Sequence, residues 1–180
     1  MKKKRLSDSK AEQAIPLKEI PIVVSGCLLG ICCRYDGTQS ASQGIIHFAS
    51  SANLIPICPE QLGGLPTPRH PAKILGGDGQ DVLSGKAAVI NSMGEDVTDA
   101  YRKGAKEALK VARLVRSSIA LLREKSPSCG LTTPYCEKST NSGMGVTAAL
   151  FHRSGIRTFD INPNEDFPPP NFLEHFREIS

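Results

Sequence analysis

Six cysteines are the residues in this 180-residue chain whose type and spacing best suit chemistry. Cys27, Cys58 and Cys129 each follow a short apolar run, and they lie far apart along the chain. Thiolates serve as nucleophiles and as ligands for soft metals. No two cysteines form the Cys-x-x-Cys pair typical of closed zinc sites. Three thiols without an obvious fourth ligand suit a [4Fe–4S] cluster in which one iron has no protein ligand and acts as a Lewis acid.

The other cysteines leave alternatives open. Cys33 is the rival of the three as a ligand, whereas we expect Cys32 and Cys136 to be bystanders. Several of the six could instead be buried as small hydrophobic residues. A cluster-free enzyme with a cysteine nucleophile would need an accessible histidine, and His70 in a proline-rich loop is the best candidate.

Hydrophobic patterning predicts the elements that must position these thiols. Apolar runs predict strands at 20–26, 54–57, 86–90, 118–122 and 156–161. Helical spacing predicts helices at 41–51, 98–115, 148–152 and 172–179. Thr98 is the expected N-cap of the second helix, and Gly155 should end the third. We expect 59–86 to be mostly loop, 54–57 to be an edge strand because of Pro56, and 86–90 to form half of a hairpin over 91–94.

Alternating strands and helices predict the fold class α/β, a three-layer, Rossmann-like domain with a largely parallel sheet and helices on both faces. The loops that follow the carboxyl ends of parallel strands gather at one edge of the sheet, where ligands bind. Cys27, Cys58 and Cys129 all lie in such loops. The pattern therefore predicts that these three thiols converge.

The domain organisation and the charge follow from composition. We expect a flexible basic segment at 1–19, one α/β domain at 20–161, and a linker with a short helix at 162–180. The net charge is +4, of which residues 1–20 supply +3, so the body is nearly neutral and stable nucleic-acid binding is not expected. No long apolar run or secretory signal pattern occurs. We therefore expect a cytoplasmic protein without membrane association, with reduced thiols.

Four segments together resemble the DUF523 family, whose characterised members are thiouracil desulfidases of the TudS type. They are VSGCLLG with CRYDG (24–37), PICPEQLGGLPTPR (56–69), GGDGQDV (76–82), and KSPSCG (125–130) with GMGVT (143–147). The resemblance covers roughly residues 20–161 and is highly specific for the family. This sequence departs from the family pattern at Cys32, at Cys136 and in its long basic N-terminus.

The resemblance implies a [4Fe–4S] cluster held by Cys27, Cys58 and Cys129, with one iron not ligated by protein. It also implies hydrolytic, non-redox removal of sulfur from a thiolated pyrimidine, such as 4-thiouracil or 4-thio-UMP. The products would be the oxo-pyrimidine and sulfide, and the only partner would be this small molecule. The alternatives are a non-catalytic iron–sulfur or metal-binding protein and a cluster-free cysteine-dependent enzyme.

Residues near these motifs supply the remaining candidates. Catalytic roles as proton donors, acceptors or hydrogen-bonding groups are predicted for four residues near the cysteines: Glu60, Lys125, Ser126 and Ser128. Substrate binding is predicted for Arg34, Arg69, Gly143, Gly145 and Thr147, the last three because backbone N–H groups at a helix start can hold a phosphate. Each also has an ordinary structural interpretation, as a turn cap, an ion pair or a tightly packed glycine.

Overall fold

A computed structural model describes residues 17–132, 134–136 and 143–179. The predicted flexible basic segment lies outside the described residues for 1–16, and 17–19 form a short 3-10 helix, η1 (Leu17–Glu19). No helix in the described ranges is both long and apolar enough to cross a membrane.

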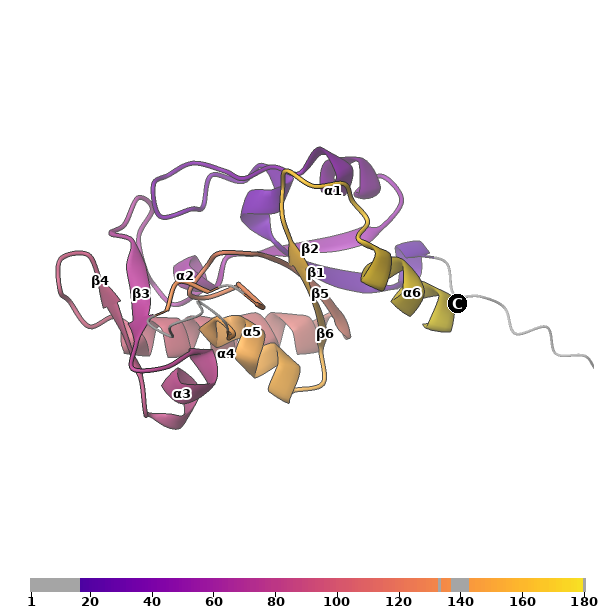
Figure 1. The fold of residues 1–180 in the computed structure, drawn as a ribbon. Coiled ribbons are helices and arrows are strands. Elements are labelled where there is room, and N and C mark those ends of the chain that lie inside the picture. The colour runs from indigo at the N-terminus through magenta and orange to yellow at the C-terminus, as the bar shows by residue number, and fades with distance from the viewer. Residues whose placement is uncertain (1–16, 133, 137–142, 180) are drawn as a thin grey trace, which may run out of the picture.

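A four-stranded parallel sheet forms the centre of the fold (Figure 1). Its strands are β1 (Pro21–Ser25), β2 (Asn53–Ile57), β5 (Ile119–Arg123) and β6 (Arg157–Ile161), in the order β2-β1-β5-β6. β1 and β5 are almost wholly buried, as their unbroken apolar runs require in a sheet covered on both faces. β2 lies at an edge of the sheet. An edge strand can contain Pro56, which has no backbone N–H to donate.

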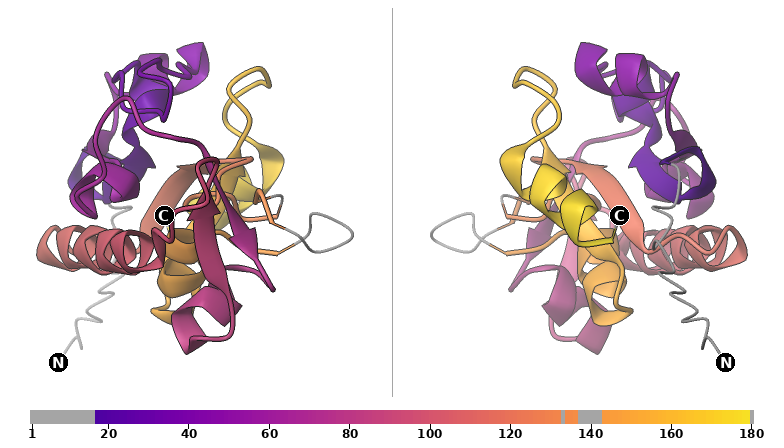
Figure 2. Two further views of the ribbon diagram at one scale, coloured as in Figure 1. Left: turned by 90° about the vertical axis from the view of Figure 1, so that its left-hand side faces the viewer. Right: turned by 90° about the vertical axis from the view of Figure 1, so that its right-hand side faces the viewer.

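Helices cover both faces of this sheet, so the predicted three-layer α/β fold is confirmed (Figures 1 and 2). On one face, α4 (Thr98–Leu114) and α5 (Val146–Arg153) pack through Ala108, Ala112 and Phe151 against Val23 and Ala120. On the other face, α1 (Gln43–Phe48) and α6 (Pro170–Ile179) close over the opposite side chains of the same strands. Successive side chains of β1 and β5 thus pack into two different hydrophobic cores, one on each face of the sheet.

The predicted loop at 59–86 is wrong, because three short elements lie in it. They are α2 (Pro59–Leu62), β3 (Ala72–Leu75) and α3 (Gly79–Ser84). The strand predicted at 86–90 is β4 (Ala88–Asn91), and it pairs antiparallel with β3. The hairpin expected over 91–94 is also present in part, because an antiparallel bridge joins Ile90 to Asp96 and the Val97 N–H donates to the Val89 carbonyl. The β3–β4 hairpin packs on α3, α4 and α5 around a third small core.

The start of α4 differs from the expectation that Thr98 caps it. Thr98 is the first helical residue, Val97 occupies the cap position, and no side chain caps the helix there. The Thr98 hydroxyl instead accepts the backbone N–H of Val89 at 2.8 Å, while Asp96 accepts the N–H of Thr98. The threonine therefore joins the hairpin to the helix. The predicted helix end at Gly155 agrees with its φ of +76° directly after α5.

Candidate functional site

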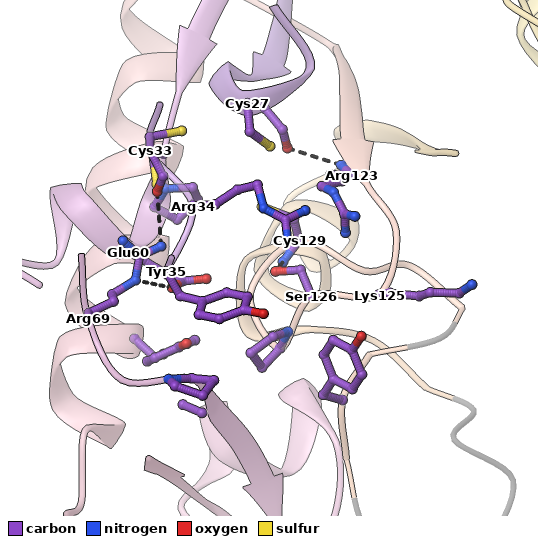
Figure 3. A pocket seen from close by; sticks show the side chains of 18 of the residues that line it. Cys27, Cys33, Arg34, Tyr35, Glu60, Arg69, Arg123, Lys125, Ser126 and Cys129 are labelled. Carbon is purple, nitrogen blue, oxygen red and sulfur yellow. Dashed lines mark hydrogen bonds and ion pairs between the residues drawn. The ribbon is translucent and has the colours of Figure 1, made fainter. Parts of the chain in front are cut away.

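A cavity of about 410 Å³ lies at the carboxyl edge of the sheet, between the strand ends and the β3–β4 hairpin (Figure 3). Cys27, Cys58 and Cys129 all line it, and so does Cys33. The order β2-β1-β5-β6 places the chain's change of direction between β1 and β5, the point at which open parallel sheets bind ligands. Three thiols that are distant in sequence therefore share one cavity.

Each of these cysteines has its own support. Cys27 lies in a 3-10 turn, η2 (Gly26–Leu29), directly after β1, and Cys58 begins α2 directly after β2. Cys129 lies in the loop after β5, where the Ser126 hydroxyl oxygen accepts the N–H groups of Ser128 and Cys129 at 3.2 and 3.1 Å. α2 can approach α4 because Gly104 has no side chain, since a Cβ there would overlap the Pro59 carbonyl.

The four thiols influence one another. A hydrogen bond with Cys27 is the largest cause that raises the pKa of Cys33, to about 11. The hydrogen bond with Cys33 and burial raise the pKa of Cys58 far above its ordinary value. Burial raises the pKa of Cys129 to about 12. Without a cation, the thiols of Cys33, Cys58 and Cys129 stay protonated, which makes them poor nucleophiles. A bound metal group would stabilise their thiolate forms.

The donors of the cavity fit an iron–sulfur group better than a single ion. Among the residues that the structure describes, no three His, Cys, Asp or Glu side chains are spaced to surround one metal ion. The thiols nevertheless come from three separate strand ends around one cavity, and all six cysteines are free. Thiolates spread around a wider space are the donor set that holds iron–sulfur clusters.

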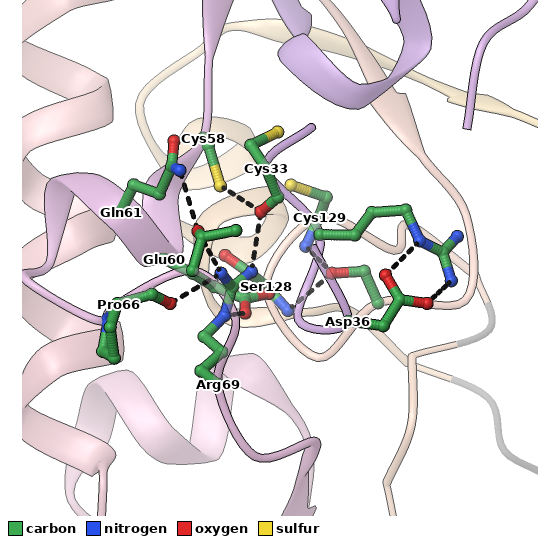
Figure 4. Close-up of polar contacts among 12 residues, drawn as sticks. Cys33, Asp36, Cys58, Glu60, Gln61, Pro66, Arg69, Ser128 and Cys129 are labelled. Carbon is green, nitrogen blue, oxygen red and sulfur yellow. Dashed lines mark hydrogen bonds and ion pairs between the residues drawn. The ribbon is translucent and has the colours of Figure 1, made fainter. Parts of the chain in front are cut away.

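Glu60 lines the same cavity and is held by Arg69 (Figure 4). The Arg69 Nε donates to the Glu60 Oε2 at 2.5 Å, and the two side chains are 6% and 13% exposed. The other nitrogens of Arg69 donate to the carbonyls of Cys33 and Pro66 and to the Thr67 hydroxyl, at 3.1–3.2 Å. Four of its five N–H groups are therefore engaged within the protein. Arg69 braces the site, whereas the sequence predicts it as a substrate ligand.

Tyr101 approaches Glu60 from α4. Its side chain is 2% exposed and lines the cavity close to the Glu60 carboxylate. Burial, followed by the charge of Glu60, raises the pKa of the Tyr101 phenol well above its usual range. The phenol therefore stays protonated and can act as a donor.

The residues around Cys129 separate into different roles. Ser126 lines the cavity and, because its oxygen accepts two N–H groups, keeps its own proton free to donate. Ser128 does not line the cavity: it is 1% exposed and pairs with the Thr147 hydroxyl at 2.9 Å. Lys125 lines the cavity but extends away from the thiols in Figure 3, and its side chain is 59% exposed.

The predicted phosphate site at the start of α5 is not supported. The N–H groups of Gly145, Val146 and Thr147 donate to the carbonyls of Gly130, Pro127 and Ser128, at 2.7–2.9 Å. A Cβ on Gly145 would lie 2.5 Å from the Ser128 oxygen, and one on Gly143 would meet the Asp78 carboxylate at 2.7 Å. Gly145 therefore allows the Cys129 loop to pack against α5, Gly143 allows the Asp78 side chain to approach, and neither glycine lines the cavity.

Arg34, which the sequence predicts to bind substrate, lines the cavity. Its guanidinium pairs with Asp36 at 3.4 Å and lies 5.6 Å from the centre of the Tyr35 ring. Sequence reasoning missed other polar residues that line the cavity, among them Ser25, Tyr35, Tyr101 and Arg123. Tyr101 repeats with the apolar face of α4 and so gave no separate signal, whereas Ser25 and Tyr35 lie inside the motifs noted above.

His70 and the two cysteines expected to be bystanders lie outside this cavity. His70 is exposed and lines a neighbouring cavity, not the one with the thiols. Cys32 is exposed. Cys136 is buried in the small core beneath β3 and β4.

Comparisons with known proteins identify the family of this chain. The family model described as 2-thiouracil desulfurase matches residues 22–162. A Bacillus subtilis (strain 168) relative described as an uncharacterized protein, YbbK, is 43% identical over 148 residues, which are 81% of this chain and 98% of the relative. A solved structure described as a [4Fe-4S]-dependent thiouracil desulfidase, TudS, is 33% identical with a TM-score of 0.68, over 88% of this chain and 96% of that one. The chain therefore belongs to the 2-thiouracil desulfurase family, as a TudS-like member.

Proposed function

We propose that this protein is a desulfidase that removes sulfur from a thiolated pyrimidine with a [4Fe–4S] cluster held by Cys27, Cys58 and Cys129. The observation that carries the proposal is that these thiols, from the ends of three parallel strands, line one cavity together with Glu60. Family membership and the TudS-like fold support the reaction class. Six free thiols suit a reducing compartment such as the cytoplasm.

The reaction is a hydrolysis in which a thiocarbonyl and water give a carbonyl and hydrogen sulfide, without net redox change. The bound cluster supplies a soft Lewis-acidic iron, not ligated by protein, for the thiocarbonyl sulfur. Glu60, fixed by Arg69, takes a proton from the attacking water. The Ser126 hydroxyl is a neutral donor that lines the same cavity and can hydrogen-bond the pyrimidine, and Tyr101 lies beside Glu60.

The cavity also bears on the form of the substrate. Its volume of about 410 Å³ leaves room for more than a pyrimidine ring, and Arg34 and Lys125 are cations on its lining. A substrate with a phosphate, such as 4-thio-UMP, would meet these side chains and not the start of α5. Sulfide release from 2-thiouracil, 4-thiouracil and 4-thio-UMP, measured side by side, tests this assignment.

The experiment that tests the proposal uses anaerobically reconstituted protein, with iron content and sulfide release measured together. Cys27→Ser, Cys58→Ser and Cys129→Ser should each lose iron and activity. Cys136→Ser is the matched control, because Cys136 is as buried as Cys27, each 8% exposed, but lies outside the cavity. A fully active Cys58→Ser protein would contradict the ligand assignment.

The two alternatives predict different results in the same experiment. An iron-loaded protein that releases no sulfide from any thiopyrimidine would indicate a non-catalytic iron–sulfur protein. An iron-free protein that remains active would indicate a cysteine nucleophile. The raised thiol pKa values and the position of His70 outside the cavity argue against that nucleophile.

A further inference from the structure

A buried hydroxyl at the end of β1, Ser25, has no role in the reaction proposed above. Ser25 is 2% exposed, lines the cavity and stands two residues before Cys27. A polar side chain in such a place needs hydrogen-bonding partners, because an unpaired buried hydroxyl is destabilising. The partners of Ser25 connect β1, β5 and the loop that carries Cys129.

The hydrogen bonds of Ser25 fix the direction of its proton. The Ser25 Oγ accepts the backbone N–H of Arg123, at the end of β5, at 3.1 Å. A hydroxyl has a single proton to donate. Ser25 and Cys129 line the same cavity, and the Ser25 hydroxyl lies near enough to the Cys129 sulfur to favour its thiolate form. When Cys129 is a thiolate it has no proton of its own, so Ser25 must be the donor.

The two other serines near Cys129, Ser126 and Ser128, have different hydrogen-bonding partners. Ser126 accepts the backbone N–H groups of Ser128 and Cys129, and its own proton is assigned to the pyrimidine in the reaction proposed above. The Ser128 hydroxyl also reaches Cys129, but it shares its proton with the Thr147 hydroxyl at 2.9 Å. Ser25 is therefore the serine whose proton is held towards the Cys129 sulfur by a backbone contact on its other side.

We propose that Ser25 is a positioning residue that donates a hydrogen bond to the Cys129 thiolate and so stabilises the cluster against oxidative loss. This inference rests on the proposed function, because it assumes that Cys129 is a ligand. A hydrogen bond to a ligand sulfur withdraws electron density and favours the more electron-rich form of a cluster, which raises its reduction potential. A cluster with a higher potential is harder to oxidise, which suits a hydrolytic reaction that does not change its redox state.

The test compares Ser25→Ala with Ser117→Ala in cluster-loaded protein. Ser117 is the matched control because it is also buried and bonds the same two strands at their other end, accepting the N–H of Val23 and donating to the Ile119 carbonyl. Spectroelectrochemistry should show a more negative potential for Ser25→Ala alone. The cluster absorbance of this variant should also disappear several-fold faster in air.

Further outcomes keep the inference separate from the proposed function. Ser25→Thr retains the hydroxyl and should keep the wild-type potential, even if Ser25→Ala is poorly folded. A Ser25→Ala potential equal to those of wild type and Ser117→Ala would overturn the inference alone. Wild-type protein that takes up no cluster under anaerobic reconstitution would overturn the proposed function and this inference with it.

Discussion

Replacing Arg69 with methionine should unfold this protein more easily, because Arg69 is a brace and not a substrate ligand. The change would leave the Glu60 carboxylate, 13% exposed, without its cation and the Cys33 and Pro66 carbonyls without a donor. Breaking a buried ion pair by removing one partner costs about 3–5 kcal/mol. At about 2–4 °C per kcal/mol for a chain of this size, the Tm should fall by about 6–20 °C.

The assay is thermal unfolding of the metal-free protein, followed by calorimetry or circular dichroism. Arg34→Ala is the control, because the Arg34–Asp36 pair is exposed, 22% and 35%, and such pairs are worth about 0–1 kcal/mol. Its Tm should stay within about 4 °C of wild type. If Arg69→Met melted as Arg34→Ala does but raised KM, Arg69 would be a substrate ligand and the reasoning would be refuted.

Two other predictions concern the Cys129 loop and the thiols. Gly145→Ala should destabilise the protein by about 1–3 kcal/mol, because the new Cβ would lie 2.5 Å from the Ser128 carbonyl oxygen, and an unchanged Tm would contradict this close packing. The metal-free protein should lose stability as the pH rises from about 9 to about 12, because the thiols of Cys33 and Cys129, with pKa values raised to about 11 and about 12, keep their protons longer than the unfolded chain does. Its urea midpoint should therefore be lower at about pH 10 than at about pH 7, and equal midpoints would contradict the raised values.

The parts of the fold that depend on local pattern could be predicted from the sequence. The apolar runs at 20–26 and 118–122 lie in strands because each residue can be buried in a sheet covered on both faces. The helix from Thr98 followed from residues that repeat every three or four positions. The β3 strand was missed because its four residues show no clear alternation, and its pairing with β4 joins segments more than ten residues apart.

The sequence by itself determined which thiols of the site directly follow strands. Because the carboxyl ends of parallel strands lie at one edge of a sheet, this already places Cys27, Cys58 and Cys129 near that edge. Only the tertiary structure decided what Arg69 and Gly145 do. A guanidinium or a glycine can serve a substrate or the protein itself, and the difference lies in which distant groups take its donors or fill the space beside it. Those partners come from other segments of the chain, so no local pattern carries that information.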